Sequence, residues 1–179
     1  LFACKNFQVS RNARSSLSAP DDAVWTPRRR WNQSTENLYA TFVETLLDYP
    51  LEDDQTWTSL QQLIDNSEKN LLHNYLGHNE DDKLSMVPDC ADLPYFLRAY
   101  FAWKMKLPFA YRKCSGGYKN HPPKCAEELY TPAFVHGKKN SVQAFRAFLR
   151  QLASGVHSGN ARTAPTDSLT DMYPVDLTH

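Results

Sequence analysis

One cysteine in the chain, Cys90, has neighbours that could support chemistry. It lies between Asp89 and Ala91, and Pro94 follows four residues later. Proline has no backbone N–H and is tolerated in the first turn of a helix, so Pro94 predicts an N-cap at Ala91 or Asp92 and places Cys90 at the mouth of a helix. Backbone N–H groups and the positive end of the helix dipole stabilise a thiolate there and can hold an oxyanion. The pattern predicts a candidate cysteine nucleophile.

The same segment also has a structural interpretation. Asp89 and Asp92 place negative charge beside the sulfur, which disfavours a thiolate unless a histidine imidazolium pairs with it. Cysteine is among the most frequently buried residue types, so Cys90 is alternatively a small apolar residue that fills the junction between a loop and a core helix. Asp92 is alternatively an ordinary N-cap. These residues alone leave both interpretations open.

The elements that must position Cys90 are predicted to be mostly helical. Apolar residues recur at helical spacing in four segments, and the widest apolar face belongs to the third, which follows Cys90 directly. The expected helices begin after a cap at Ser34 or Thr35 and end before Pro50, run from Asp53 or Asp54 to about Leu72, from Asp92 to Lys106, and from Ser141 to about Gly155. Short strands are expected over 108–113, 131–135 and 173–177.

The hydrophobic content of the chain is sufficient for a buried core. The 179 residues are 41% hydrophobic and 12% aromatic, which suits a single domain over 24–179 behind a polar, flexible tether over 1–23. Twenty basic and twenty acidic residues balance, so no global field attracts nucleic acid or anionic lipid. The local exception is Arg28 to Arg30 beside Trp31, which we interpret as a solvated or salt-bridged patch. No apolar run is long enough to span a membrane.

The segment 86–109 resembles a known class of enzyme. Asp89-Cys90-Ala91-Asp92, the aromatic-rich helix that follows, and Lys106-Leu107-Pro108-Phe109 together resemble the nucleophile segment of papain-like bacterial cysteine hydrolases, of the NlpC/P60 or transglutaminase-like kind. The resemblance implies an α+β fold in which a predominantly helical half packs on a small or incomplete antiparallel sheet. It also implies that Cys90 attacks an amide carbonyl and that helix amides after Cys90 hold the oxyanion. We expect no cofactor and no metal.

These families carry a histidine base on a downstream strand. His136 follows Ala133-Phe134-Val135 and is the best placed by local pattern, so the predicted catalytic set is Cys90, His136 and Asp92. The chain departs from the family because no downstream histidine lies in an apolar run preceded by glycine. The other downstream histidines are His121, His157 and His179. Because the sequence is mostly helical and stops as a strand begins, we expect a fragment whose sheet and true histidine lie elsewhere, with neither Leu1 nor His179 assigned as a natural end.

The remaining cysteines bear on the compartment. Cys114 and Cys125 flank a loop rich in glycine and proline, which favours a disulfide, with zinc bound together with His121 as the rival interpretation. A disulfide indicates an oxidising compartment. The opening Leu1-Phe2-Ala3-Cys4 is similar to the end of a removed secretion signal or to a lipid-anchor site at Cys4. We therefore expect an exported protein that is periplasmic, outer-membrane-associated or extracellular.

Two functions follow from these observations. The first is a cell-envelope cysteine hydrolase that cleaves an amide or peptide bond in a peptide or peptidoglycan-like substrate. The alternative is a non-catalytic subunit of an envelope assembly, in which Trp25, Arg28 to Arg30 and Trp31 form either an interface anchor or a hydrophobic staple. The expected partners are another protein chain or the remainder of the precursor, and no nucleic acid. The acidic run from His78 to Asp82 is interpreted as a solvated loop and not as a metal site.

Overall fold

The computed structural model describes residues 23–113, 115, 126–127, 130–132 and 142–156, and the backbone of 162–163 and 171–172. The elements in chain order are α1 (Gln33–Leu47), α2 (Leu60–Ile64), the 3-10 helix η1 (Asp81–Lys83), α3 (Asp92–Met105), α4 (Val142–Ala153), β1 (Arg162–Thr163) and β2 (Asp171–Met172). β1 and β2 form a two-stranded antiparallel pair in which Arg162 lies opposite Met172. The described part of the chain is therefore predominantly helical, as the sequence predicts.

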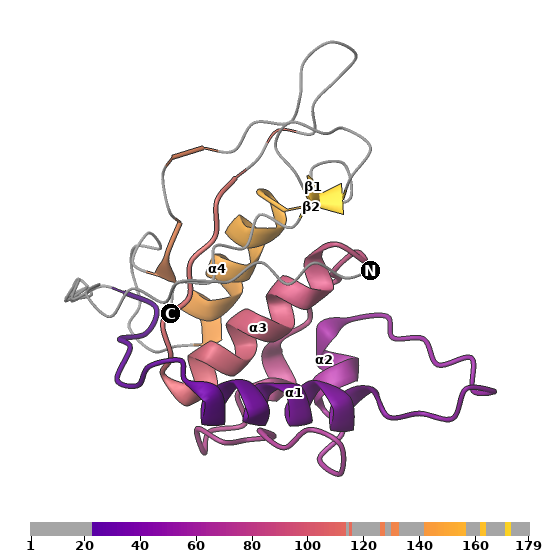
Figure 1. Ribbon diagram of the computed structural model, residues 1–179. Coiled ribbons are helices and arrows are strands. Elements are labelled where there is room, and N and C mark those ends of the chain that lie inside the picture. The colour runs from indigo at the N-terminus through magenta and orange to yellow at the C-terminus, as the bar shows by residue number, and fades with distance from the viewer. Residues whose placement is uncertain are drawn as a thin grey trace, which may run out of the picture.

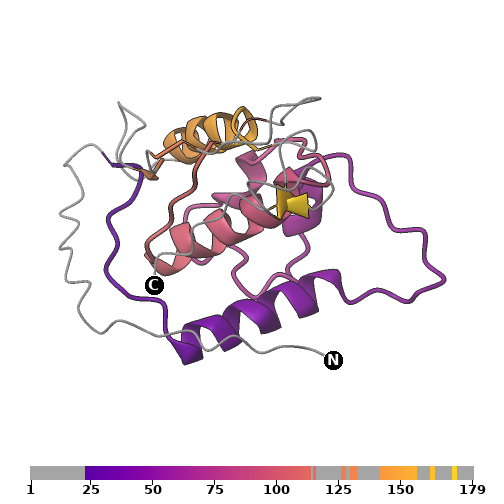
Figure 2. The same ribbon diagram turned by 45° about the horizontal axis from the view of Figure 1, so that its top comes forward.

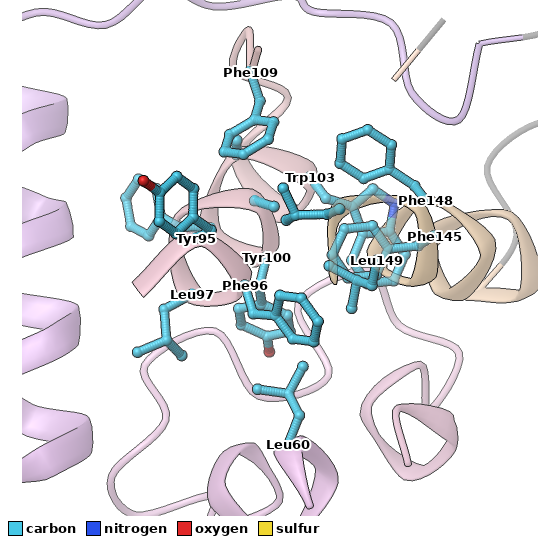
Figure 3. Close-up of a cluster of buried hydrophobic side chains, with 14 of the residues drawn as sticks. Leu60, Tyr95, Phe96, Leu97, Tyr100, Trp103, Phe109, Phe145, Phe148 and Leu149 are labelled. Atoms are coloured by element: carbon cyan, nitrogen blue, oxygen red, sulfur yellow. The ribbon is translucent and has the colours of Figure 1, made fainter. Parts of the chain in front are cut away.

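Helix α3 occupies the centre of the fold. It lies between α1 and α4, which cover it from opposite sides (Figure 2). Every residue from 95 to 105 is buried, which is the expected environment for a helix that is apolar almost all round. The closest ring contact joins α3 to α4, because Trp103 stacks on Phe145 with centroids 4.2 Å apart, and Phe148 and Leu149 lie nearby (Figure 3).

Helix α1 begins slightly earlier than predicted. The side chain of Asn32 accepts a hydrogen bond from the Thr35 N–H at 3.0 Å, and the Thr35 hydroxyl accepts one from the Asn32 N–H at 2.7 Å. This reciprocal capping box satisfies two backbone donors and fixes Asn32 as the N-cap, instead of Ser34 or Thr35. The helix ends at Leu47, before Pro50. The predicted helix is thus present, with its start shifted by its cap.

The predicted second helix is largely wrong. Of this predicted helix, only α2 forms. The chain between α1 and α2 makes a wide loop away from the other helices (Figure 1). The side chain of Asn66 accepts from the N–H groups of Glu68 and Lys69, and the side chain of Asn70 accepts from the N–H of Leu72. These side chains take backbone donors that a continuing helix would use. Local asparagine bonds therefore replace the predicted helix after α2 with turns.

The segment before α1 is fastened to the end of α3. The indole N–H of Trp25 donates to the carbonyl of Leu107, and that of Trp31 donates to the carbonyl of Pro108, each at 2.8 Å. Both tryptophans are buried. They therefore act as a staple, and the interpretation of these two rings as an exposed interface anchor is wrong.

Little of the predicted strand structure occurs among the described residues. The segment 108–113 forms a single antiparallel bridge, between Tyr111 and Tyr130, in place of a strand. The strand predicted over 131–135 lies largely outside the described residues, and the one over 173–177 lies entirely outside them. In the described ranges, the helices are all too short or too polar to cross a membrane.

Candidate functional site

Cys90 lies exposed at the start of the central helix. It precedes α3 by two residues, and the N-cap falls at Ala91, in agreement with the prediction from Pro94. The side chain of Cys90 is open to solvent and not packed in the core. The interpretation of Cys90 as a buried apolar plug is therefore wrong, and the thiol is accessible to a reagent or a substrate.

The turn that contains Cys90 is capped by the residue before it. Oδ1 of Asp89 accepts hydrogen bonds from the N–H groups of Ala91 and Asp92, each at 2.8 Å, and the carbonyl of Asp89 accepts from the N–H of Leu93 at 3.1 Å. Pro94, next in the turn, has no N–H to offer. The amides after Cys90, which the resemblance assigns to the oxyanion, are therefore already bound to Asp89.

Asp92 belongs to the same capping arrangement. Its side chain is buried, and its Oδ2 accepts from the backbone N–H of Asp89 at 3.3 Å. Asp89 and Asp92 thus bond reciprocally across the turn, as the two members of a capping box do. The structure therefore shows Asp92 fixing the turn that precedes α3.

The backbone N–H of Cys90 itself remains available. Within the described ranges, neither this N–H nor the Cys90 thiol makes a hydrogen bond. An oxyanion formed on a substrate attacked by the sulfur would therefore meet the Cys90 N–H as the open donor of this turn. This donor differs from the ones that the resemblance assigns.

The predicted base and the disulfide lie outside the described residues. His136 falls there, as do the other downstream histidines and the cysteines Cys114 and Cys125. The two histidines that the structure does describe are paired with carboxylates. His73 Nε2 lies 3.5 Å from Asp65, and His78 Nδ1 lies 2.9 Å from Glu80. The structure therefore describes Cys90 and Asp92, and the catalytic set of Cys90, His136 and Asp92 stays a prediction.

The acidic run after Gly77 is buried in part, and not a solvated loop as predicted. Glu80 and Asp81 are almost fully buried, and both pair with the buried ammonium of Lys104, which lies 2.8 Å from Oδ1 of Asp81. The hydroxyl of Tyr100 donates to the same Oδ1 at 2.8 Å, and Asn70 Nδ2 donates to the Tyr100 oxygen at 3.0 Å. We call these five residues the buried polar network.

Hydrogen bonds keep Glu80 ionised inside the core. Burial raises the pKa of Glu80, but hydrogen bonds from Lys104, from the N–H of Leu76 and from His78 outweigh it and lower that pKa to about 2. For Tyr100, burial and the neighbouring carboxylates both raise the pKa well above its ordinary value. Glu80 therefore remains ionised at neutral pH.

The buried polar network attaches the segment 70–81 to α3. Two carboxylates face one ammonium, and they also accept hydrogen bonds from backbone N–H groups. The N–H of Asn74, for example, donates to Asp81 Oδ2 at 2.7 Å. Sequence reasoning missed this network, although one signal was present. Lys104 follows Tyr100 by four residues on the apolar face of the predicted helix, and a lysine buried there requires an acidic partner.

A second ion pair fixes α3 to α1. Both terminal nitrogens of Arg98 donate to the Glu36 carboxylate, at 2.8 and 2.7 Å. The guanidinium also lies over the ring of Trp31, 3.3 Å from its centroid, and near Tyr39 at 4.5 Å. Bidentate pairing and stacking suit arginine better than lysine. Together with the buried polar network, this pair holds the helix that begins beside Cys90 on two sides.

Comparisons with family models, with curated proteins and with solved structures return no match to this chain.

Proposed function

We propose that this chain supplies the nucleophile of an exported cell-envelope cysteine hydrolase of the papain-like type, which cleaves an amide or peptide bond in a peptide or peptidoglycan-like substrate. The observation that carries the proposal is the exposed thiol of Cys90, two residues before a central helix that is buried from Tyr95 to Met105. A nucleophile must be accessible and rigidly held, and this position supplies both properties.

The proposed reaction passes through a thioester on Cys90. The Cys90 sulfur gives its proton to a histidine, for which His136 is the candidate, and attacks the amide carbonyl carbon. The C–N bond then breaks, the imidazolium returns the proton to the leaving amine, and a thioester remains on the sulfur. Water hydrolyses the thioester and regenerates the thiol. The Cys90 N–H is the proposed donor to the oxyanion in both steps.

The alternative proposal is a non-catalytic subunit of a periplasmic or extracellular envelope assembly. One observation favours it, because the amides of Ala91 and Asp92 are bonded to Asp89 and do not point to an anion from a substrate. Under this proposal the resemblance reflects the fold of the helical half alone. The thiol would then behave as an ordinary exposed cysteine.

Site-specific alkylation separates the two proposals. The full chain is treated with a limiting amount of iodoacetamide at pH 6, natively and in denaturant, and modification of Cys90 is counted by peptide mass spectrometry. A hydrolase nucleophile reacts faster in the native chain than in the denatured one, since its base and helix act only when folded. His136→Ala should remove the excess, and His73→Ala, which alters a histidine paired elsewhere, should not. Equal native and denatured rates would overturn the hydrolase proposal.

A further inference from the structure

A group of basic side chains stands out because no acid in the described ranges neutralises it. Arg28, Arg29 and Arg30 are exposed, and none of them forms an ion pair with the residues that the structure describes. The contrast is with Arg98 and Lys104, which both pair with carboxylates inside the fold. The arginine side chains therefore carry charge at the surface that no acid among the described residues compensates.

The backbone holds this charge in place. The N–H groups of Arg28 and Arg29 both donate to the carbonyl of Lys106, at 2.8 and 3.1 Å. The segment is also stapled on each side by the buried rings of Trp25 and Trp31. The arginines thus extend from a fixed stretch of chain at the end of α3, and little backbone entropy is lost when they bind a partner.

Lys106 adds a fourth charge beside them. It is half-buried, and its pKa is lowered first by burial and then by the positive charge of Arg28. The hydrogen bonds of the Arg28 and Arg29 N–H groups to the Lys106 carbonyl place these three residues side by side, and Arg30 follows directly in the chain. We call these four cations the basic cluster (Arg28, Arg29, Arg30 and Lys106). An anion placed there would relieve the repulsion.

We infer that the basic cluster is a contact site for the phosphate headgroups of an anionic bilayer surface. Guanidinium groups bind phosphate oxygens in a bidentate manner, and a bilayer requires only local, exposed positive charge, to which each arginine adds about fivefold in partitioning. Nucleic acid fits less well, since the adjacent aromatic rings of Trp25 and Trp31 are buried and cannot stack on bases. The inference does not depend on the role of Cys90.

The test is sedimentation of the full chain with vesicles made of equal parts phosphatidylcholine and phosphatidylglycerol. We expect binding at low ionic strength that weakens as salt is added, and no binding to vesicles of phosphatidylcholine alone. The double variant Arg28→Gln/Arg30→Gln should lose about 25-fold in partitioning. The matched control Lys83→Gln/Arg150→Gln removes the same charge from two exposed positions elsewhere and should change it by less than about twofold.

Three outcomes would overturn the inference: no sedimentation at low ionic strength, equal losses in the two double variants, or tighter binding to a DNA duplex than to vesicles at equal phosphate concentration. The salt dependence of the wild-type chain tests the inference even if the arginine variant folds poorly, which circular dichroism detects. Cys90→Ala should bind vesicles like the wild type. A failed vesicle experiment and a failed alkylation experiment are therefore independent results.

Discussion

The ammonium of Lys104 and the carboxylate of Asp81 face each other in the core, with Nζ 2.8 Å from Oδ1 and both side chains buried. This pair joins the central helix to the turn-rich segment that precedes Cys90. Because the charges are shielded from water, the pair has a large effect when one partner is removed, whereas an exposed pair has little.

Replacing Lys104 with methionine is expected to destabilise the fold by about 3–5 kcal/mol, since Glu80 and Asp81 would remain buried without a counter-charge. Urea unfolding followed by circular dichroism measures the change. Lys83→Met is the control, because Lys83 is exposed and its replacement should stay within about 0.5 kcal/mol. Similar losses in the two variants would show that the ion pair does not matter.

The buried network also predicts a dependence on acid. The pKa of Glu80 is lowered to about 2 in the folded chain, below the ordinary 4.5, so its contribution to stability is complete above pH 4.5 and is lost as the pH falls toward 2. The difference in Tm between the wild type and Glu80→Gln should therefore be largest at neutral pH and shrink over this window. Glu44→Gln, at an exposed position of α1, should show no such trend. A Tm difference between the wild type and Glu80→Gln that stays constant with pH would contradict the lowered pKa of Glu80.

The backbone at the end of α3 offers a stabilising substitution. Lys106 is the left-handed C-cap, with φ 57° and ψ 44°, a conformation that glycine adopts without strain. Lys106→Gly should raise the free energy of unfolding by about 1 kcal/mol in thermal or urea unfolding. Lys106→Gln removes the charge and keeps the Cβ. The difference in the free energy of unfolding between the glycine and glutamine variants therefore measures the backbone strain alone. A glycine variant no more stable than the glutamine variant would refute the prediction.

The Asp89 cap can be separated from its charge. Asp89→Ala removes the acceptor for the N–H groups of Ala91 and Asp92 and should cost about 0.5–2 kcal/mol in unfolding experiments. Asp89→Asn keeps an acceptor and should retain most of that stability. Both variants remove a negative charge next to Cys90, so both should increase its alkylation rate. A rate that rises in the alanine variant alone would assign the effect to the freed amides and not to the charge.

Helical periodicity predicted α1, α3 and α4 to within a few residues at each end, because each carries an apolar face that packing confirms. Asp53 and Asp54 resembled a helix start, but α2 begins only at Leu60, after its cap at Ser59. Side chains such as Asn66 then compete for the backbone, and that competition depends on geometry that spacing does not encode.

The candidate site was predictable in position and not in detail. Pro94 located Cys90 at a helix start because the restriction on proline is local. The bonding of Asp89 to two amides does not follow from the sequence, because an aspartate one residue before Cys90 can act either as a charge or as a cap. The burial of Glu80 and Asp81 was missed because the carboxylates are neighbours of Lys104 only in three dimensions.

The two indole hydrogen bonds at the end of α3 limit where the following chain can pair with a strand. Trp25 and Trp31 occupy the carbonyls of Leu107 and Pro108, the N–H of Leu107 donates to Ala102, and proline has no N–H. The peptide groups of these two residues therefore offer no free donor to a neighbouring strand, and each carbonyl already has a partner. Ladder formation can start only further along, and the first bridge is at Tyr111. The two tryptophans thus prevent strand pairing directly after α3, as covered edges do in other proteins.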